Sequence, residues 1–243
     1  MSSRNNRIKA VVLAGGKGRR LAPYTQIIPK PLMPIGDKPI LEILLRQMKR
    51  AGIRDVTLTV GYLADLLRLF FRDGQRLGLK IHYVQENKPL GTSGPLSNVE
   101  GLDNTFLVTN GDVLTTLDLK DLITFHKAQK SIATIAIHKR KVDINLGVVD
   151  IDGDKVVTGY QEKPSIDYLA SMGLYVFEPR VLEYIPKDEY LDFPDLVHKL
   201  LEADEKVSGY VFRGYWEDLG RPDDYDRASK DFETMRSEFL PEE

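Results

Sequence analysis

Short apolar runs of strand length alternate along the chain with longer segments whose apolar residues recur at helical spacing. Runs of apolar and β-branched residues predict buried strands, and apolar residues three and four apart predict helices that cover them. A helix is predicted from Pro39 to its stop at Gly52, and further helices at 62–72 and 119–130. The strands predicted in this half are 8–14, 55–60, 80–85, 105–109 and 132–137.

The second half of the chain shows a different order of elements. Residues 147–151 and 155–160 flank Asp152-Gly153-Asp154, which is a hairpin signal. The elements predicted after it are a strand at 172–177, a helix at 193–203, a strand at 207–212 and a helix at 221–236. This order predicts an α/β fold with a mixed, mostly parallel central sheet flanked by helices and a small antiparallel insertion after residue 138.

No Pro/Gly/Ser-rich linker divides the sequence, so residues 1–243 are expected to form a single catalytic domain. The segment 219–240 either caps the sheet or joins a homodimer, and the cap is the favoured interpretation. A homodimer is therefore the alternative prediction for this segment.

Composition excludes several classes of protein. A net charge of −2 does not fit a protein that lives on nucleic acid, and no apolar run approaches the length of a membrane span. The absence of cysteine excludes disulfides and thiolate chemistry, and the four histidines lack metal-ligand spacing. Residues 1–7 are polar and do not resemble a secretory signal. We therefore expect a cytoplasmic protein with no membrane or nucleic-acid partner.

A glycine-rich loop follows the first strand, at the edge where open α/β sheets bind ligands. The segment 13–20 (LAGGKGRR) combines three glycines with Lys17, Arg19 and Arg20, but it lacks the dinucleotide and Walker A patterns. Glycine lets backbone amides approach a phosphate, and Pro29 and Pro31 hold Lys30 on a stiff backbone. The loop favours a polyphosphate site; the alternative is a tight, solvated turn.

Two aspartates follow predicted strands near the same edge. Asp112 closes an Asn-Gly-Asp segment, and Asp218 lies in the segment 216–220 (WEDLG). Two carboxylates can share a Mg²⁺ ion that also binds phosphate oxygens, although each aspartate alone is more typical of a turn or helix cap. The segment 91–95 (GTSGP) lacks the last glycine of a serine-hydrolase elbow, and no spacing indicates a glycosidase pair. Together, the glycine loop with its arginines, the stiffly held lysine and the two aspartates suit transfer at a phosphorus centre.

Six ordered motifs give the chain a resemblance to the sugar-1-phosphate nucleotidylyltransferases, most of all those that transfer guanylyl groups to mannose 1-phosphate or heptose 1-phosphate. The motifs are GGKGRRL with PKP at 15–31, PLGTSG at 89–94, NGD at 110–112, GVV at 147–149, EKP at 162–164 and WEDLG at 216–220. The resemblance implies a Rossmann-like nucleotidyltransferase fold. It also implies Mg²⁺-assisted, in-line attack of a sugar 1-phosphate on the α-phosphorus of a nucleoside triphosphate, with release of pyrophosphate.

The resemblance also implies roles for individual residues. The catalytic group comprises Arg20, Lys30, Asp112 and Asp218, of which Asp112 and Asp218 hold the metal. The nucleotide-binding set comprises Leu13, Gly15, Gly16, Lys17, Gly18, Gln85, Gly91, Thr92, Asn110 and Gly111. The sugar-phosphate set comprises Gly147, Glu162, Lys163, Ser171 and Gly173. Ser171-Met172-Gly173 stands where the family usually has Asn-Ala-Gly, so one sugar contact differs.

The loop 89–96 favours GTP, with UTP or dTTP and a glucose-type sugar 1-phosphate as the alternative. No hexapeptide-repeat domain of the kind that many relatives carry is expected from this sequence. A second alternative is a regulatory module that binds a sugar nucleotide without turnover. A third is a glycosyltransferase, for which Asp152-Gly153-Asp154 has the spacing of a metal motif, although the same residues read as a hairpin turn.

Overall fold

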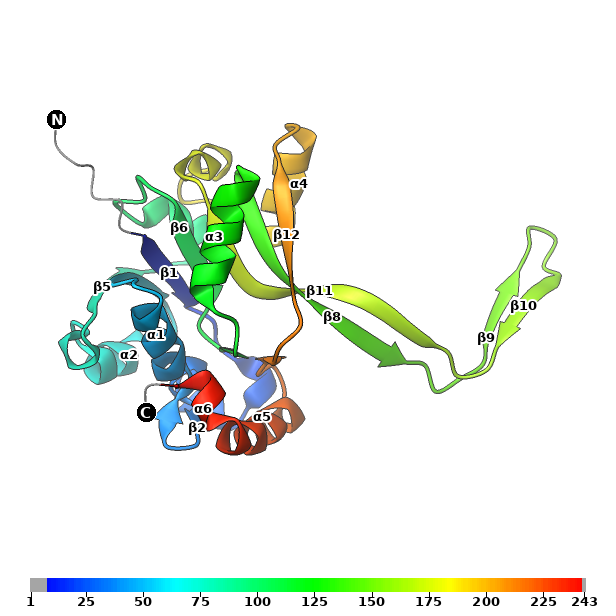
Figure 1. The fold of residues 1–243 in the computed structure, drawn as a ribbon, viewed down its shortest axis with the longest axis horizontal. Helices are drawn as coiled ribbons and strands as arrows, with labels where there is room; N and C mark the ends of the chain where they lie inside the picture. The colour runs from blue at the N-terminus through cyan, green and yellow to red at the C-terminus, as the bar shows by residue number, and fades with distance from the viewer. Residues whose placement is uncertain (1–7, 242–243) are drawn as a thin grey trace.

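The computed structural model describes residues 8–241, so the prediction about residues 1–7 lies outside the described residues. A seven-stranded sheet runs through the molecule in the order β12-β8-β11-β6-β1-β4-β5 (Figure 1). Its strands are β1 (Lys9–Ala14), β4 (Asp55–Val60), β5 (Lys80–Gln85), β6 (Phe106–Asn110), β8 (Ala133–Asp143), β11 (Ser165–Phe177) and β12 (Val207–Phe212). Only β11 runs antiparallel to its neighbours, which confirms the mixed, mostly parallel sheet.

Helices cover both faces of the sheet because side chains alternate along the buried strands. In β1, Ala10 and Val12 join the core beneath α1, α2 and α3, whereas Val11 joins the core beneath α4 on the other face. The helices are α1 (Ile40–Arg50), α2 (Ala64–Phe71), α3 (Leu119–Gln129), α4 (Phe193–Glu202), α5 (Pro222–Thr234) and α6 (Arg236–Phe239). No helix within residues 8–241 combines the length and apolar character needed to cross a membrane.

The carboxyl-terminal helices pack onto the body of the molecule. Phe232 of α5 and Phe239 of α6 are fully buried in a third cluster that includes Ile40 and Ile43 of α1 and Leu114. Gln47 of α1 donates to the backbone oxygens of Thr115 and Phe239, at 2.8 and 3.3 Å. The segment 219–240 therefore caps the fold, which is the interpretation that the sequence favoured. The helix predicted at 221–236 is α5, and the short helix α6 that follows it was not predicted.

Two short strand pairs were not predicted, since two or three residues carry too little periodicity to signal a strand. One pair joins β2 (Pro34–Ile35) to β3 (Lys38–Pro39), directly before α1. The other joins β7 (Val113–Thr115) to β13 (Trp216–Asp218) and brings together segments about a hundred residues apart. The second pair matters for function because each strand adjoins one of the two aspartates.

A β-ribbon projects from the sheet and is the largest departure from the predicted elements (Figure 1). β8 and β11 continue beyond the sheet as a two-stranded ladder, whereas the sequence predicted strands only at 132–137 and 172–177. The hairpin β9 (Val148–Ile151) and β10 (Val157–Gln161) forms its far end and confirms the antiparallel insertion. The added strand residues are charged or solvent-facing, so they lack the apolar run that marks a buried strand.

Candidate active site

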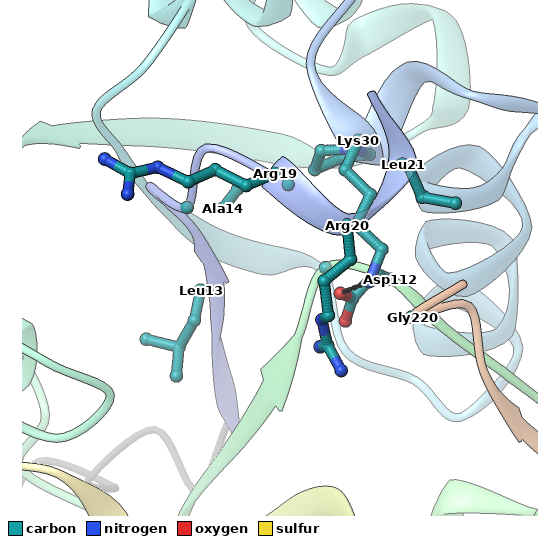
Figure 2. Close-up of a pocket in the computed structure, with 12 residues that line it drawn as sticks. Leu13, Ala14, Arg19, Arg20, Leu21, Lys30, Asp112 and Gly220 are labelled. Carbon is teal, nitrogen blue, oxygen red and sulfur yellow. Dashed lines mark hydrogen bonds and ion pairs between the residues drawn. The ribbon is translucent and has the colours of Figure 1, made fainter. Parts of the chain in front are cut away.

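A cavity of about 260 Å³ lies at the carboxyl ends of β1 and β6. Figure 2 shows Arg20 and Lys30 from the glycine loop on the same side as Asp112, whereas Arg19 points away from it. The cavity is lined by Leu13, Ala14, Gly16, Gly18, Arg19, Arg20, Leu21, Lys30, Pro31, Gly111, Asp112 and Gly220. Three segments that are distant in the sequence thus form one site.

The glycine loop turns back on itself immediately after β1. Gly18 has a left-handed backbone with φ of 59°, and a Cβ there would lie 3.0 Å from Thr25 Cγ2 and 3.3 Å from Lys30 Cβ. The Thr25 hydroxyl donates to the Gly18 carbonyl oxygen at 2.8 Å. Only glycine combines that backbone with so close an approach, so the loop carries Lys30 back into the cavity.

Parallel strands bring the Asn-Gly-Asp segment beside the glycine loop. Leu13 in β1 is in register with Asn110 in β6, and the Gly111 amide donates to the Leu13 carbonyl oxygen at 3.0 Å. This bond continues the ladder one residue beyond the strand, and Asp112 follows directly. The parallel pairing therefore places the Asp112 carboxylate at the mouth of the same cavity that the loop surrounds.

The β7–β13 pair brings the second aspartate to the first. Val113 is in register with Asp218, so the Asp112 and Asp218 carboxylates approach one another. The Lys30 ammonium bonds to Asp112 and lies 3.6 Å from Asp218 Oδ1. Burial, and then the neighbouring Asp112 charge, raise the pKa of Asp218. Lys30 thus offsets part of a charge repulsion that is built into the site.

Arg20 completes this charged group. A Cβ on Gly220 would lie 3.2 Å from Arg20 Nη1 and 3.3 Å from Asp218 Oδ2, so the guanidinium and the carboxylate meet over that glycine. All four residues predicted as catalytic therefore converge: Arg20, Lys30, Asp112 and Asp218. The side chains come from the loop after β1 and from the segments on either side of the β7–β13 pair.

The donor set fits a hard divalent cation. Within residues 8–241, no three His, Cys, Asp or Glu side chains form a ready-made metal cluster. Asp112 and Asp218 nevertheless face one position and share a single ammonium group. Mg²⁺ prefers one or two carboxylates and completes its shell with water and phosphate oxygens. The two aspartates can therefore hold such an ion, since they face one position with a single ammonium group between them.

The opposite side of the glycine loop faces a half-buried carboxylate that the predicted binding set omitted. Glu86 follows β5, and a Cβ on Gly15 would lie 2.4 Å from Glu86 Oε1. Burial raises the pKa of Glu86. By contrast, the exposed Gln85 side chain accepts from Arg68 at 3.3 Å. The sequence feature that could have identified Glu86 is its position directly after the predicted strand 80–85, at the sheet edge where the glycine loop also lies.

Gly91 and Thr92 occupy a structured turn against the start of α4. Gly91 has φ of 77°, and a Cβ there would lie 2.6 Å from the Leu191 carbonyl oxygen. The Thr92 amide and hydroxyl donate to Asp192 Oδ1 at 2.9 and 3.1 Å, and the Phe193 amide donates to the Thr92 hydroxyl. These bonds give both residues a structural role, and their nucleotide-binding role stays a prediction. Lys17 is exposed in the glycine loop.

The predicted sugar-phosphate residues fall into two groups. Gly173 lies at the edge of the site, since a Cβ there would lie 2.6 Å from Asn110 Nδ2; Ser171 is its near neighbour. Gly147, Glu162 and Lys163 lie instead where the β9–β10 hairpin joins the β8–β11 ladder, outside the cavity lining. Glu162 accepts there from the Tyr160 hydroxyl at 2.8 Å. The structure thus brings the first pair to the site and leaves the other three apart.

The Asp152-Gly153-Asp154 segment forms the turn between β9 and β10. Asp152 Oδ1 accepts from the backbone amides of Asp154 and Val156 at 3.0 and 2.9 Å. Its carboxylate therefore stabilises the hairpin, as the turn interpretation of this segment predicted.

A buried ionic connection behind the site was also missed. Glu217 is almost fully buried and bonds to Arg140 and Arg227, and the Arg140 guanidinium stacks 4.6 Å from the Trp216 ring centroid. A lone glutamate in the middle of a motif gives no sign of these partners, which lie 77 and 10 residues away.

Comparisons with known proteins agree with this geometry. Residues 9–235 match the Nucleotidyl transferase family. The chain is 39% identical over 236 residues to a mannose-1-phosphate guanylyltransferase of Mycobacterium tuberculosis, covering 93% of this chain and 65% of that protein. It is 35% identical over 241 residues to a UTP–glucose-1-phosphate uridylyltransferase of Synechocystis, covering 91% and 62%.

A solved structure supports the same assignment. HddC from Yersinia pseudotuberculosis, complexed with GMP-PN, superposes with a TM-score of 0.71 at 28% identity, covering 93% of this chain and 99% of HddC. The chain spans somewhat less than two thirds of the length of the two curated relatives. Its match over residues 9–235 and the converging site establish that this chain belongs to the Nucleotidyl transferase family.

Proposed function

We propose that the chain is a sugar-1-phosphate nucleotidylyltransferase that condenses GTP with mannose 1-phosphate or heptose 1-phosphate. Residues 1–243 would act as one catalytic domain in the cytoplasm. The observation that carries the proposal is the convergence of a glycine loop, Arg20, Lys30 and two aspartates on one cavity. This arrangement can bind a triphosphate and neutralise charge that develops on it, and phosphoryl-transfer chemistry needs little else from a protein.

The reaction needs no protein nucleophile. A phosphate oxygen of the sugar 1-phosphate forms a bond to the α-phosphorus as the bond from that phosphorus to the β-phosphate oxygen breaks. Pyrophosphate leaves with the bonding electrons. Arg20 is placed to stabilise the negative charge on this leaving group, and the backbone of Gly16 and Gly18 provides the surface on which the phosphates lie.

Lys30 has two tasks in this proposal. It offsets part of the negative charge of Asp112 and Asp218 before substrate binds, and it presents a cation to the reacting phosphate. Mg²⁺ held by the two aspartates would supply charge neutralisation at the phosphate oxygens.

Glu86 supports guanine over the other bases. A carboxylate accepts hydrogen bonds only, and guanine offers it two adjacent donors, N1–H and N2–H, whereas uracil offers one. Glu86 lies against Gly15, on the side of the loop away from the aspartates. The mannose-1-phosphate guanylyltransferase relative and the HddC complex with GMP-PN support the same preference.

Two alternatives remain distinguishable by experiment. The Synechocystis relative supports the same reaction with UTP and glucose 1-phosphate. A regulatory module that binds sugar nucleotides without turnover is less well supported, because Arg20, Lys30 and Asp112 all line the cavity and Asp218 lies beside Lys30.

The proposal is tested by pyrophosphate release in a matrix of four nucleoside triphosphates against mannose, heptose and glucose 1-phosphates with Mg²⁺. We expect the highest kcat/KM with GTP and mannose or heptose 1-phosphate. Release of free nucleoside diphosphate from a sugar nucleotide would indicate a glycosyltransferase instead, and nucleotide binding without release would indicate the regulatory module.

A further inference from the structure

The projecting ribbon begins at the site itself. We define the arm as residues 138–170, the part of the β8–β11 ribbon beyond the sheet together with the β9–β10 hairpin. The ladder is continuous from Ser171–Ile137 to Ser165–Asp143. The pairing of β8 with β11 shifts register between Ser171 and Tyr175. Gly173 lies within this irregular stretch and packs against Asn110 at the edge of the site. At about 3.3 Å per residue, the seven paired rows carry the arm roughly 20 Å away from the cavity edge before the hairpin begins.

The root of the arm is anchored on the β7–β13 pair. Arg140 bonds to Glu217 and stacks on Trp216, and the Trp216 indole donates to the Met172 carbonyl oxygen at 3.0 Å. His138 Nε2 lies 3.0 Å from the Gly214 carbonyl oxygen. Because these contacts and the ladder fix the direction of the arm, its far end can reach its own cavity only by breaking paired rows.

The two faces of the arm differ in polarity. Directly paired residues share a face, so Val142 and Ile166 lie with Tyr168 on one side. The pairs Ser165–Asp143 and Asp167–Lys141 lie on the other side, where Asp167 also forms an ion pair with Lys139 at 2.6 Å. Beyond Arg140, one face of the ladder is therefore apolar and solvent-exposed, whereas the opposite face is mostly charged or polar, with Leu169 as its exposed apolar residue.

Exposed apolar side chains concentrate on the arm. Ten of the 19 exposed large hydrophobic residues in the described part of the chain lie there, and the hairpin contributes five of them. Not all of them share one face, since Leu169 lies on the opposite side of the ladder from Val142, Ile166 and Tyr168. A two-stranded ribbon is marginally stable by itself in water, so a partner on the apolar face would stabilise it.

The arm also carries the sugar-phosphate residues that the cavity lacks. Glu162 and Lys163 follow β10, both exposed, while Ser171 and Gly173 lie at the root beside Asn110. A site that needs both groups is incomplete within one extended chain. Within a two-fold dimer, the arm of each copy can lie against the other copy and reach the other copy's cavity. The same contact then occurs twice, and each occurrence buries the apolar face of one arm.

We propose that two copies of this chain exchange arms, so that Glu162 and Lys163 of each copy bind the sugar phosphate in the cavity of the other. The assignment of those two side chains to the sugar phosphate rests on the proposed function. The arm contact itself rests on the apolar face, the anchored root and the length of the ladder.

Subunit mixing tests the exchange through activity. Arg20→Ala and Lys163→Ala are prepared separately, each with little activity, and then co-expressed with different tags so that mixed dimers form. With exchanged arms, one of the two sites in a mixed dimer contains an intact Arg20 and an intact Lys163. Random pairing should therefore restore about a quarter of wild-type pyrophosphate release. Arms that serve their own cavities give no recovery above the two variants alone, and this result would overturn the proposal.

Cross-linking tests the arm contact without activity, and the absence of native cysteines makes it specific. Lys163→Cys and Arg19→Cys proteins are mixed and treated with a short bismaleimide. Exchange predicts a covalent product of twice 27.6 kDa that contains both chains. No product, together with a monomer by sedimentation at micromolar concentration, would refute exchange even in an active enzyme. A cross-linked dimer without pyrophosphate release from the wild type would support the contact and reject the proposed function.

A matched pair of variants identifies the face that makes the contact. Ile166→Asp lies on the apolar face and Leu169→Asp on the polar one, and both positions are exposed on the same strand. We expect Ile166→Asp to weaken dimerisation at least tenfold in sedimentation equilibrium and Leu169→Asp to leave it within about twofold. Circular dichroism verifies that both fold. Equal dimerisation of the two variants would show that the apolar face is not the interface.

Discussion

Individual side chains in the cavity have separable tasks, and adjacent residues in the glycine loop illustrate this. Arg19 and Arg20 are both exposed and both line the cavity, yet only Arg20 meets the Asp218 carboxylate over Gly220. Figure 2 shows the two guanidinium groups pointing in different directions. Similar sequence environment therefore does not mean similar function here, and the pair provides an internal control.

Arg20→Ala should lower kcat by about 10²–10³, the range found when one preorganised charge-stabilising donor is removed. Arg19→Ala should lower it by less than about tenfold, because its side chain points away from Asp112. Steady-state pyrophosphate release measures both, and thermal unfolding checks that the folds are equivalent. Equal losses from the two variants would contradict the assignment.

Glu86 offers a test of base preference at the same scale. Glu86→Gln exchanges one acceptor oxygen for a donor, so it should lose a bond to guanine and lower the ratio of kcat/KM for GTP over UTP by about tenfold or more. Asn87→Ala, at the exposed neighbouring position, is the control. An unchanged ratio in Glu86→Gln would show that the carboxylate does not contact the base.

At the scale of elements, buried charge joins helix α1 to the loop that follows α2. Glu42 is 4% exposed and bonds to Arg46 at 2.7 Å and to Arg76 at 2.8 Å. Burial raises the pKa of Glu42, but the bonds from Arg76 and Arg46 outweigh it and leave the pKa below its usual value. The carboxylate is thus more stable as an anion in the folded chain than in the unfolded one.

Glu42→Gln should therefore destabilise the protein by about 2 kcal/mol at pH 7, where the bonds involve a charged acceptor. The stabilising effect of Glu42 is present above the unfolded pKa of about 4.3 and is lost as pH falls through the lower folded pKa. Urea unfolding at pH 7 and at pH 3.5 should show the difference between the two proteins shrinking at the lower pH. A difference independent of pH would contradict the ionic origin.

Periodicity predicted the buried elements well, because a strand such as β1 must place alternate apolar residues on two covered faces. The Arg20–Lys30–Asp112 group was predictable for a related reason, since adjacent parallel strands end at one edge. The extension of β8 and β11 beyond the sheet was not predictable. Its two strands pair with each other in solvent, so neither carries the apolar residues that mark a buried strand. The direction of the arm depends on contacts such as Arg140 with Glu217, which no local pattern encodes.

At the scale of the whole molecule, the fold gathers the glycine loop, Lys30 and the two aspartates at one edge of the sheet, and a β-ribbon extends away from the sheet (Figure 1). The capping helices α5 and α6 bury Phe232 and Phe239 against α1, which holds β13 and hence Asp218 in place. The charged group around the cavity is therefore assembled within one chain, whereas Glu162 and Lys163, which we propose to bind the sugar phosphate, lie on the arm between β10 and β11.

The central claim is that Asp112 and Asp218 act as one unit within a single cavity, and a double-mutant cycle measures this directly. We expect Asp112→Asn and Asp218→Asn each to lower Mg²⁺-dependent pyrophosphate release by about 10³, and the double variant to lose little more than either single one, since groups that act together are non-additive. Losses that multiply in the double variant, or full activity in either single variant, would contradict the account.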